Sequence, residues 1–353
     1  MVSTPFVAVP PPAYGGTELV VHSLTRALER AGHEVVVFAT GDSQVPRLRA
    51  LFNEPVWPPD AHAELLHCRF AAREIQAGDF DVVHAHCSFL LAFAPELKPP
   101  VVYTLHHDVQ ATLSRYYRRI PGVRFVAISA RQAELADPPA REVVHHGLDP
   151  ELYPVVGPGG DAAFFLGRLS HCKAPDLAVE AAARADVPLI VAGKVHEGDD
   201  MPGWEQALRR ALSRSHVRWV EGADLAAKRR FFARSRALLV PLRWEEPFGL
   251  VMIEALLAGC PVIASARGAA PEIVEEGRTG FLVGGVRDMA AALRRAPRLD
   301  RLAIQARARE RFSSARMADR YLAVYRSALA DRVLGREARH AVAGEEGWTT
   351  LAQ

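Results

Sequence analysis

The segment 244–283 constrains the fold more than any other part of the chain. An apolar, strand-like run at 237–242 is followed by a polar turn around Pro247 and then by residues 250–258, which have the length and composition of a buried helix. A second strand-like run begins at Val262. A strand, a helix and a strand in this order predict a parallel α/β sheet, whose ligands bind beyond the carboxyl ends of the strands.

Two carboxylates flank the start of the expected helix. Glu246 lies in the turn, and Glu254 lies about one turn into the helix. The free backbone N–H groups of Phe248, Gly249 and Leu250, together with the helix dipole, form a site for an anion such as phosphate. Carboxylates are better suited to accept hydrogen bonds from hydroxyls on either side of that anion, as a sugar nucleotide offers them. A solvated loop glutamate and a helix glutamate paired with arginine are the simpler alternative, which explains this spacing less well.

The same segment resembles the signature of family 4 retaining glycosyltransferases, in which seven residues separate two glutamates. The likeness extends through Gly268, Pro271-Glu272 and 279–283. The resemblance implies an α/β protein of GT-B fold: two Rossmann-like domains with doubly wound parallel sheets face each other across a crevice, and a final helix crosses back to the first domain. It also implies that Glu246 holds the hydroxyls of the donor sugar and Glu254 the ribose.

The length of 353 residues suits two α/β domains better than one core. The proline- and glycine-rich segment 149–161 is the expected linker between them. We therefore expect four parts: an acceptor-binding domain at 1–152, a donor-binding domain at 153–312, a crossover helix at 313–334 and a tail at 335–353. The apolar stripe expected on the crossover helix comprises Met317, Tyr321, Val324 and Leu329.

The composition is that of a soluble globular protein. The chain is 49% hydrophobic and 24% charged, and its net charge is +2, so it lacks the excess of basic residues typical of nucleic-acid binding. The sequence shows no apolar run of membrane-spanning length, and we expect a protein without a leader that is located in the cytoplasm. Its four cysteines have no metal-ligand spacing and are expected to be reduced thiols.

The amino-terminal region contains a glycine pair before a helix. Residues 1–9 should hold the first strand, although this strand is shorter than in proteins of the family that it resembles. Tyr14, Gly15 and Gly16 then precede a helix with apolar residues at helical spacing. Most glycine pairs are merely turns, but a pair here lets the backbone approach a ligand. The resemblance implies that Gly15 and Gly16 lie beside the donor phosphates and that Tyr14 is on the acceptor side.

Histidines gather at the ends of the strands expected in the first domain. These strands are expected at 34–40, 81–86, 101–107, 124–129 and 142–146. The histidines are His84, His86, His106, His107, His145 and His146. They lack a carboxylate or thiolate partner set, so hydrogen bonding to a polar ligand is favoured over a metal site.

Three residues of this domain are candidates for the ligand side. His106 matches the strand-end histidine of the family, which faces the sugar and the acceptor. His107 and Ser129 are candidates for the acceptor side, with a loop position and a helix N-cap as the respective alternatives. His146 stands where members of the family often have asparagine.

Cations follow the first strand of the second domain. Arg168 and Lys173 bracket the turn after the strand at 162–166, where two cations can bind one diphosphate. Surface positions are the usual alternative, but the chain contains only four lysines, so Lys173 is a poor candidate for surface filler. In the family, the matching residues neutralise the leaving diphosphate. Glu221 lies where the family receives the nucleotide base.

These features together predict a retaining glycosyltransferase. It would move a hexosyl group from a nucleotide-diphosphate sugar, with UDP-glucose slightly favoured over GDP-mannose, to an unidentified acceptor hydroxyl. The expected catalytic residues are Glu246, His106, Arg168 and Lys173, and the resemblance implies no catalytic metal or other cofactor. A sugar-nucleotide epimerase of the same fold and a catalytically silent nucleotide-sugar-binding protein are the alternatives. A dinucleotide-dependent oxidoreductase is disfavoured, because no Gly-x-Gly-x-x-Gly follows a strand.

Overall fold

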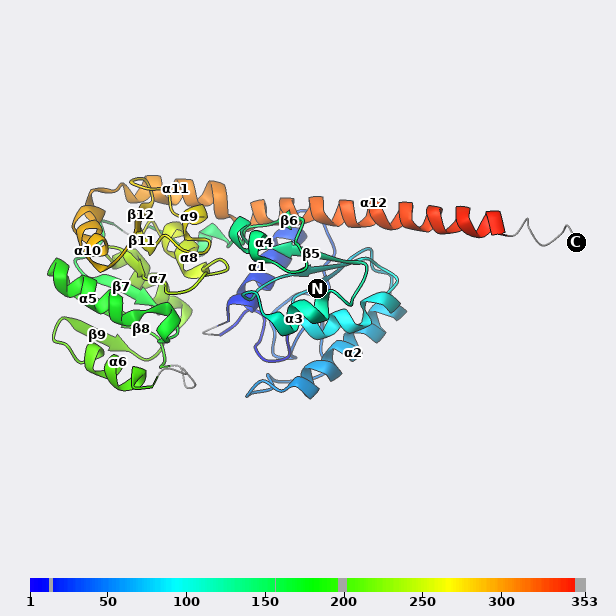
Figure 1. The fold of residues 1–353 in the computed structure, drawn as a ribbon, viewed down its shortest axis with the longest axis horizontal. Helices are drawn as coiled ribbons and strands as arrows, with labels where there is room; N and C mark the ends of the chain where they lie inside the picture. Colours follow the sequence, from blue (N-terminus) through cyan, green and yellow to red (C-terminus); the bar gives the residue numbers. More distant parts are fainter. Residues whose placement is uncertain (13–14, 156, 196–201, 347–353) are drawn as a thin grey trace, which may run out of the picture.

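The computed structural model describes residues 1–12, 15–155, 157–195 and 202–346, with side chains as far as Arg332. The chain forms two domains that lie next to each other, each a parallel sheet with helices packed on it (Figure 1). Both domains are α/β, as the apolar strands separated by helical segments predicted.

The carboxyl-terminal domain contains a six-stranded parallel sheet in the order β12-β11-β10-β7-β8-β9. Its strands are β7 (Ala163–Leu166), β8 (Leu189–Ala192), β9 (Val217–Val220), β10 (Leu238–Val240), β11 (Val262–Ser265) and β12 (Gly280–Val283). Phe164 and Phe165 are neighbours on β7, yet both are buried in different apolar clusters. Because successive side chains of a strand point to opposite faces, the sheet is covered on both faces.

Seven helices of this domain are described. They are α5 (Pro175–Ala185), α6 (Trp204–Leu212), α7 (Leu225–Arg234), α8 (Leu250–Leu257), α9 (Ala270–Ile273), α10 (Val286–Arg295) and α11 (Arg301–Phe312). Asp224 caps α7 by accepting from the N–H of Ala227. The strand, turn and helix expected around Pro247 are present as β10, a loop and α8.

The amino-terminal domain has a four-stranded parallel sheet in the order β3-β4-β5-β6. Its strands are β1 (Val37–Phe38), β2 (Leu48–Arg49), β3 (Val83–Ala85), β4 (Val101–Thr104), β5 (Val123–Ala127) and β6 (Glu142–Val143). Its helices are α1 (Gly16–Arg30), α2 (Ala61–Ala77), α3 (Ala111–Tyr117) and α4 (Ala130–Leu135). All five strands expected in this domain are shorter than the sequence predicted, and those expected at 34–40 and 142–146 have only two residues each.

The first strand was expected over residues 1–9 but is reduced to a single bridging residue. Val2 bridges Phe38 of β1 and Ala85 of β3, and so joins β1 and β2 to the larger sheet. The chain cannot continue as a central strand because Pro5 and Pro10 lack the N–H donor that a central strand needs on both sides.

The final helix, α12 (Ser314–Glu346), returns along the amino-terminal domain, as expected for a crossover helix (Figure 1). Met317, Tyr321 and Val324 are buried against α1 and the sheet. The prediction for Leu329 was wrong: it is 37% exposed, and Ala328 takes the buried position one residue earlier. The helix continues to Glu346, beyond residue 334 where its end was expected, and residues 347–353 of the expected tail lie outside the described part of the chain.

The chain passes between the domains near Leu148 and again near Ser313, and these two passages lie against each other. The N–H of Leu148 donates to Phe312 O at 2.9 Å, and the N–H of Ser314 donates to Leu148 O at 2.8 Å. A Cβ on Gly147 would overlap the carbonyl of Ser313, so only glycine allows this approach. The two crossings therefore form one paired junction.

Candidate functional site

Lys173 and Glu246 meet at the carboxyl ends of β7 and β10. The Lys173 ammonium forms an ion pair with Glu246 Oε2, which also accepts a hydrogen bond from Trp244 Nε1 at 3.0 Å. The same ammonium lies 4.9 Å from the centroid of the Trp244 ring, a cation–π distance. Glu246 is only 8% exposed, so its carboxylate is held by two fixed donors.

The backbone around Glu246 depends on two glycines. Gly249 precedes α8 with φ 87°, and Gly268 has φ 55°, both in the left-handed region. A Cβ on Gly268 would overlap the backbone of Glu246, whose carbonyl accepts from the N–H of Ala269 at 2.9 Å. The loop after β10 is thereby held against the loop after β11, and this orients the start of α8.

Glu254 is buried inside the carboxyl-terminal domain at 4% exposure. Its Oε1 accepts hydrogen bonds from Tyr153 OH and Lys228 Nζ, each at 3.0 Å. Burial raises the pKa of Tyr153, and the Glu254 carboxylate adds to this effect, so the phenol remains a donor. A ribose hydroxyl at Glu254 would therefore join or replace existing partners.

The start of α1 faces the start of α8 across the two domains. A Cβ built on Gly16 would lie 3.2 Å from Leu250 Cδ1, and one on Gly15 would lie 2.7 Å from Pro11 Cβ. A side chain at Gly16 would therefore fill the space between the two helix starts, whereas one at Gly15 would overlap Pro11 and Glu18 of its own domain. Tyr14 lies outside the described residues.

Arg168 and Glu221 follow β7 and β9 and are exposed. Within the described residues, neither side chain has a hydrogen bond or an ion pair. Arg168 therefore adds a second cation, which no described residue pairs with, to the strand-to-helix loop that carries Lys173.

Four histidines of the amino-terminal domain form a row of rings, which we call the histidine row: His84, His86, His106 and His146. His84 and His86 have ring centroids 4.1 Å apart, His86 Nδ1 lies 2.9 Å from His106 Nε2, and the rings of His106 and His146 stack at 5.2 Å and 19°. The His146 ring lies 5.1 Å from Phe248, in the turn before α8. The row thus extends from the amino-terminal sheet to the Glu246 loop.

The two acceptor-side candidates that the structure describes are engaged within their own domain. Both ring nitrogens of His107 are occupied, with Nδ1 2.6 Å from Asp108 O and Nε2 2.7 Å from Tyr117 OH. Ser129 is fully buried and caps α4 by accepting from the N–H of Gln132 at 3.0 Å. Both residues therefore have the alternative positions given above: His107 lies in a loop, and Ser129 is a helix N-cap.

A second set of contacts joins the domains. Glu272 of α9 accepts hydrogen bonds from the backbone N–H groups of Ala130 at 2.7 Å and Arg131 at 2.8 Å, at the start of α4. Its Oε2 also lies 2.9 Å from His145 Nε2. Burial alone would raise the pKa of Glu272, but these hydrogen bonds outweigh it and lower the pKa. Arg131 also donates to Glu245 at 2.8 Å. We call Glu272, Arg131 and Glu245 the interdomain latch.

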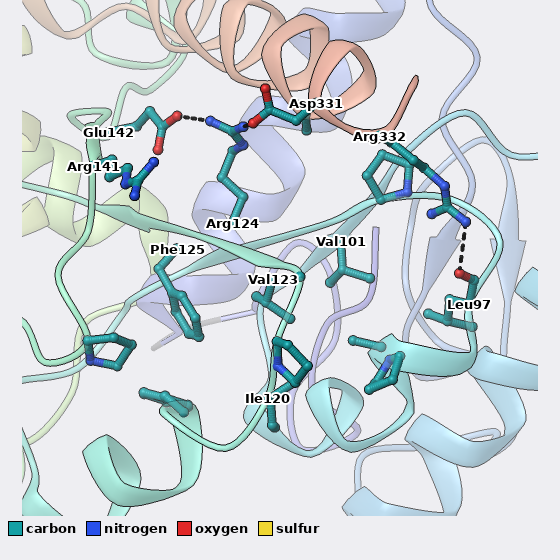
Figure 2. A pocket seen from close by; sticks show the side chains of 18 of the residues that line it. Leu97, Val101, Ile120, Val123, Arg124, Phe125, Arg141, Glu142, Asp331 and Arg332 are labelled. Carbon is teal, nitrogen blue, oxygen red and sulfur yellow. Dashed lines mark hydrogen bonds and ion pairs between the residues drawn. The ribbon is translucent and has the colours of Figure 1, made fainter. Parts of the chain in front are cut away.

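A cavity of about 910 Å³ lies elsewhere, at the amino ends of β4, β5 and β6 (Figure 2). It is lined by prolines, apolar residues and the paired side chains of Arg124, Glu142 and Asp331. It belongs to the amino-terminal domain, whereas Lys173 and Glu246 meet at the carboxyl ends of β7 and β10 in the other domain. The cavity is therefore separate from the candidate site.

The described residues include no group of three or more His, Cys, Asp or Glu side chains placed to hold a metal ion. Within the same residues, no helix is both long and apolar enough to cross a membrane.

Comparison with known proteins identifies the family. Residues 14–152 match the sequence model described as Glycosyltransferase Family 4, and residues 158–313 match that described as Glycosyl transferases group 1. A D-inositol 3-phosphate glycosyltransferase of Frankia alni is 30% identical in an alignment that covers 85% of this chain and 88% of the relative. The chain belongs to the family 4 glycosyltransferases. A second relative with the same name, from Gordonia bronchialis, is 29% identical over 89% of this chain and 84% of its own.

Solved structures share the fold of this glycosyltransferase. AviGT4, a glycosyltransferase involved in avilamycin A biosynthesis, superposes with a TM-score of 0.73 at 24% identity, over 93% of this chain and 97% of its own. HepE from Anabaena, solved with UDP and glucose, superposes with a TM-score of 0.72 at 19% identity, over 92% of this chain and 98% of its own. The family and the GT-B fold that the glutamate signature implied are therefore confirmed.

Sequence reasoning missed the partners of the two glutamates. Trp244, Lys228 and Tyr153 hold Glu246 or Glu254, and the interdomain latch was not foreseen. Lys228 carried one available signal, since it is one of only four lysines in the chain. Tyr153 carried none, because it is 101 residues from Glu254.

Proposed function

We propose that this glycosyltransferase retains the anomeric configuration while it transfers a hexosyl group from a nucleotide-diphosphate sugar of the UDP-glucose class to an acceptor hydroxyl. The observation that carries the proposal is the meeting of Lys173 and Glu246 beside the start of α8, with Gly16 opposite. A cation, a hydroxyl-accepting carboxylate and free helix N–H groups at one place suit a sugar diphosphate.

The leaving group needs the largest stabilisation. When the bond between the anomeric carbon and the phosphate oxygen breaks, the diphosphate keeps the electron pair and gains negative charge. Lys173, Arg168 and the N–H groups at the start of α8 would stabilise that charge. In this proposal, Lys173 exchanges part of its pairing with Glu246 for the diphosphate, and this frees Glu246 Oε2 for a sugar hydroxyl.

Acceptor attack would occur on the face that the diphosphate leaves. The acceptor oxygen forms the new bond to the anomeric carbon, and its proton passes to a phosphate oxygen of the leaving diphosphate. No covalent nucleophile is then required, and His106 would orient the hydroxyls. Closure of the two domains would exclude water and limit hydrolysis of the donor.

Two comparisons support the choice of substrates to test. HepE is solved with UDP-glucose, which has the donor chemistry proposed here. The curated relatives from Frankia and Gordonia are named for an inositol phosphate acceptor, so that class belongs in the acceptor panel with lipid, polysaccharide and aromatic hydroxyls.

The test begins with thermal shift measurements on UDP-, GDP- and ADP-sugars, followed by acceptor screening with the best donor. We expect a UDP-hexose to stabilise the protein, EDTA to leave the rate nearly unchanged, and the product to have the donor's anomeric configuration by proton NMR. Glu246→Gln should remove most transfer and keep most UDP affinity, whereas Glu205→Gln, on the surface of α6, should behave as wild type.

Three outcomes would contradict the proposal. A product of inverted configuration would refute retention, and unchanged turnover in Glu246→Gln would refute the role of Glu246. Free epimerised donor in the absence of acceptor would indicate the epimerase alternative.

A further inference from the structure

The histidine row contains a residue with no role in the mechanism above, His86. We propose that His86 is a positioning residue that holds His106 in the tautomer with its proton on Nδ1, so that His106 presents an N–H donor to the hydroxyls of donor or acceptor. The inference rests on the proposed function for its consequence, but the tautomer itself can be tested without turnover.

The geometry limits the pair to two arrangements. His86 Nδ1 and His106 Nε2 lie 2.9 Å apart, which is a hydrogen-bond distance. Two neutral imidazoles in such contact share one proton, since one nitrogen must donate and the other accept. Either His86 donates and His106 carries its own proton on Nδ1, or His106 donates and leaves Nδ1 bare.

The surroundings keep both rings neutral. The titratable groups that face His86 and His106 are His84, His107, His146 and the amino group of Met1, and the phenols of Tyr321 and Tyr325 on α12 lie against His84. Within the described residues, no carboxylate contacts any of its four rings. Burial lowers the pKa of His86 well below its usual value and that of His106 to about 3.

The other nitrogen of His86 decides between the two arrangements. His86 is 5% exposed, and none of the described residues hydrogen-bonds to its buried Nε2. If His106 donated, His86 would have to carry its proton on this nitrogen, as a buried N–H without an acceptor. Buried N–H groups without partners are rarer in proteins than buried acceptors without partners. His86 therefore carries its proton on Nδ1 and donates it to His106.

The consequence concerns the chemistry of His106. Its Nε2 lone pair is already occupied by His86, and no described residue bonds to its Nδ1. A histidine in this state can donate a hydrogen bond to a hydroxyl oxygen but cannot take a proton from it. This agrees with transfer of the acceptor proton to the leaving diphosphate. His86 thus determines whether His106 offers the ligand a hydrogen-bond donor or an acceptor.

The direct test is NMR of the ¹⁵N-histidine-labelled protein without ligand, with His106 assigned from the spectrum of His106→Gln. We expect a bare Nε2 and a protonated Nδ1 for His106, unchanged between pH 6 and pH 8. A protonated Nε2, or titration of His106 within this range, would overturn the proposal even if sugar transfer is confirmed.

Two nearly isosteric variants give the matched comparison. His86→Asn can still donate from the position of Nδ1, whereas His86→Asp can only accept there and should move the His106 proton to Nε2. We expect His86→Asn to retain kcat within about threefold and His86→Asp to lose about tenfold or more in kcat, with less change in UDP affinity. Equal losses in both variants would show that His86 acts only through packing. If His86→Asp does not fold, the wild-type spectrum and His86→Asn still decide the tautomer.

Discussion

At the scale of single residues, the candidate site combines one paired cation with one unpaired cation. Lys173 is partly neutralised by Glu246, whereas Arg168 has no partner within the described residues. A diphosphate carries more than one negative charge, and Arg168 can bind it through two parallel N–H groups. Arg168 should therefore contribute more to binding of the free nucleotide than to orientation of the sugar.

The residue-scale prediction is that Arg168→Ala weakens UDP binding by about tenfold or more, because a charge-assisted hydrogen bond is lost. Isothermal titration calorimetry at constant salt measures the effect. Arg287→Ala, at an exposed position at the start of α10, is the matched control and should bind UDP normally. Equal affinity in the two variants would show that Arg168 does not contact the diphosphate.

At the scale of elements, the interdomain latch joins α9 of one domain to the start of α4 in the other. The two oxygens of Glu272 accept from two successive backbone N–H groups, of Ala130 and Arg131. A glutamine offers only one oxygen, so Glu272→Gln must lose one of these bonds. The latch also ties the loop that carries Glu245 and Glu246 to Arg131 of α4, and its loss should loosen the contact between the domains.

The element-scale prediction is that Glu272→Gln raises the donor KM severalfold and increases hydrolysis of the donor relative to transfer, because water enters a less closed site. Both rates can be followed by chromatography of the released nucleotide and product. Glu275→Gln is the matched control, since Glu275 pairs with Arg307 and Arg311 within its own domain. The same change in both variants would indicate a general loss of stability instead of a latch.

At the scale of the whole molecule, the histidine row makes stability depend on pH. Burial lowers the pKa of all four histidines in the folded protein, whereas in the unfolded chain each has a pKa of about 6.5. Below this value the unfolded state binds more protons than the folded state, so the free energy of unfolding falls as pH falls. The stabilising contribution is fully present above about pH 7.5.

The molecule-scale prediction is a loss of stability between pH 7 and pH 5.5, with a slope of at most about 1.4 kcal/mol per pH unit for each histidine. Urea denaturation at several pH values measures it. His146→Asn should reduce the slope, whereas the exposed His33→Asn should not. A slope that is the same in all three proteins would mean that the row does not control acid stability.

The sequence alone determined the domain type and the family of this protein, and it supplied the candidate site residues, whose roles stay predictions. The apolar runs on either side of the polar turn at Pro247 predicted a buried strand and a buried helix, and strands buried on both faces of a sheet show no alternation. Glu246, Glu254, Arg168 and Lys173 follow from local spacing at strand ends. Such signals are short in range, so a single sequence displays them.

Only the tertiary structure decided which distant residues meet. Tyr153 reaches Glu254, Glu272 reaches the start of α4, and His86 reaches His106, and each pair comes from separate elements. The tertiary structure also reduced the first strand to Val2 and placed Ala328, not Leu329, against the core. These outcomes depend on how helices and sheets pack, and packing is set by the shapes of many side chains at once, which no local pattern records.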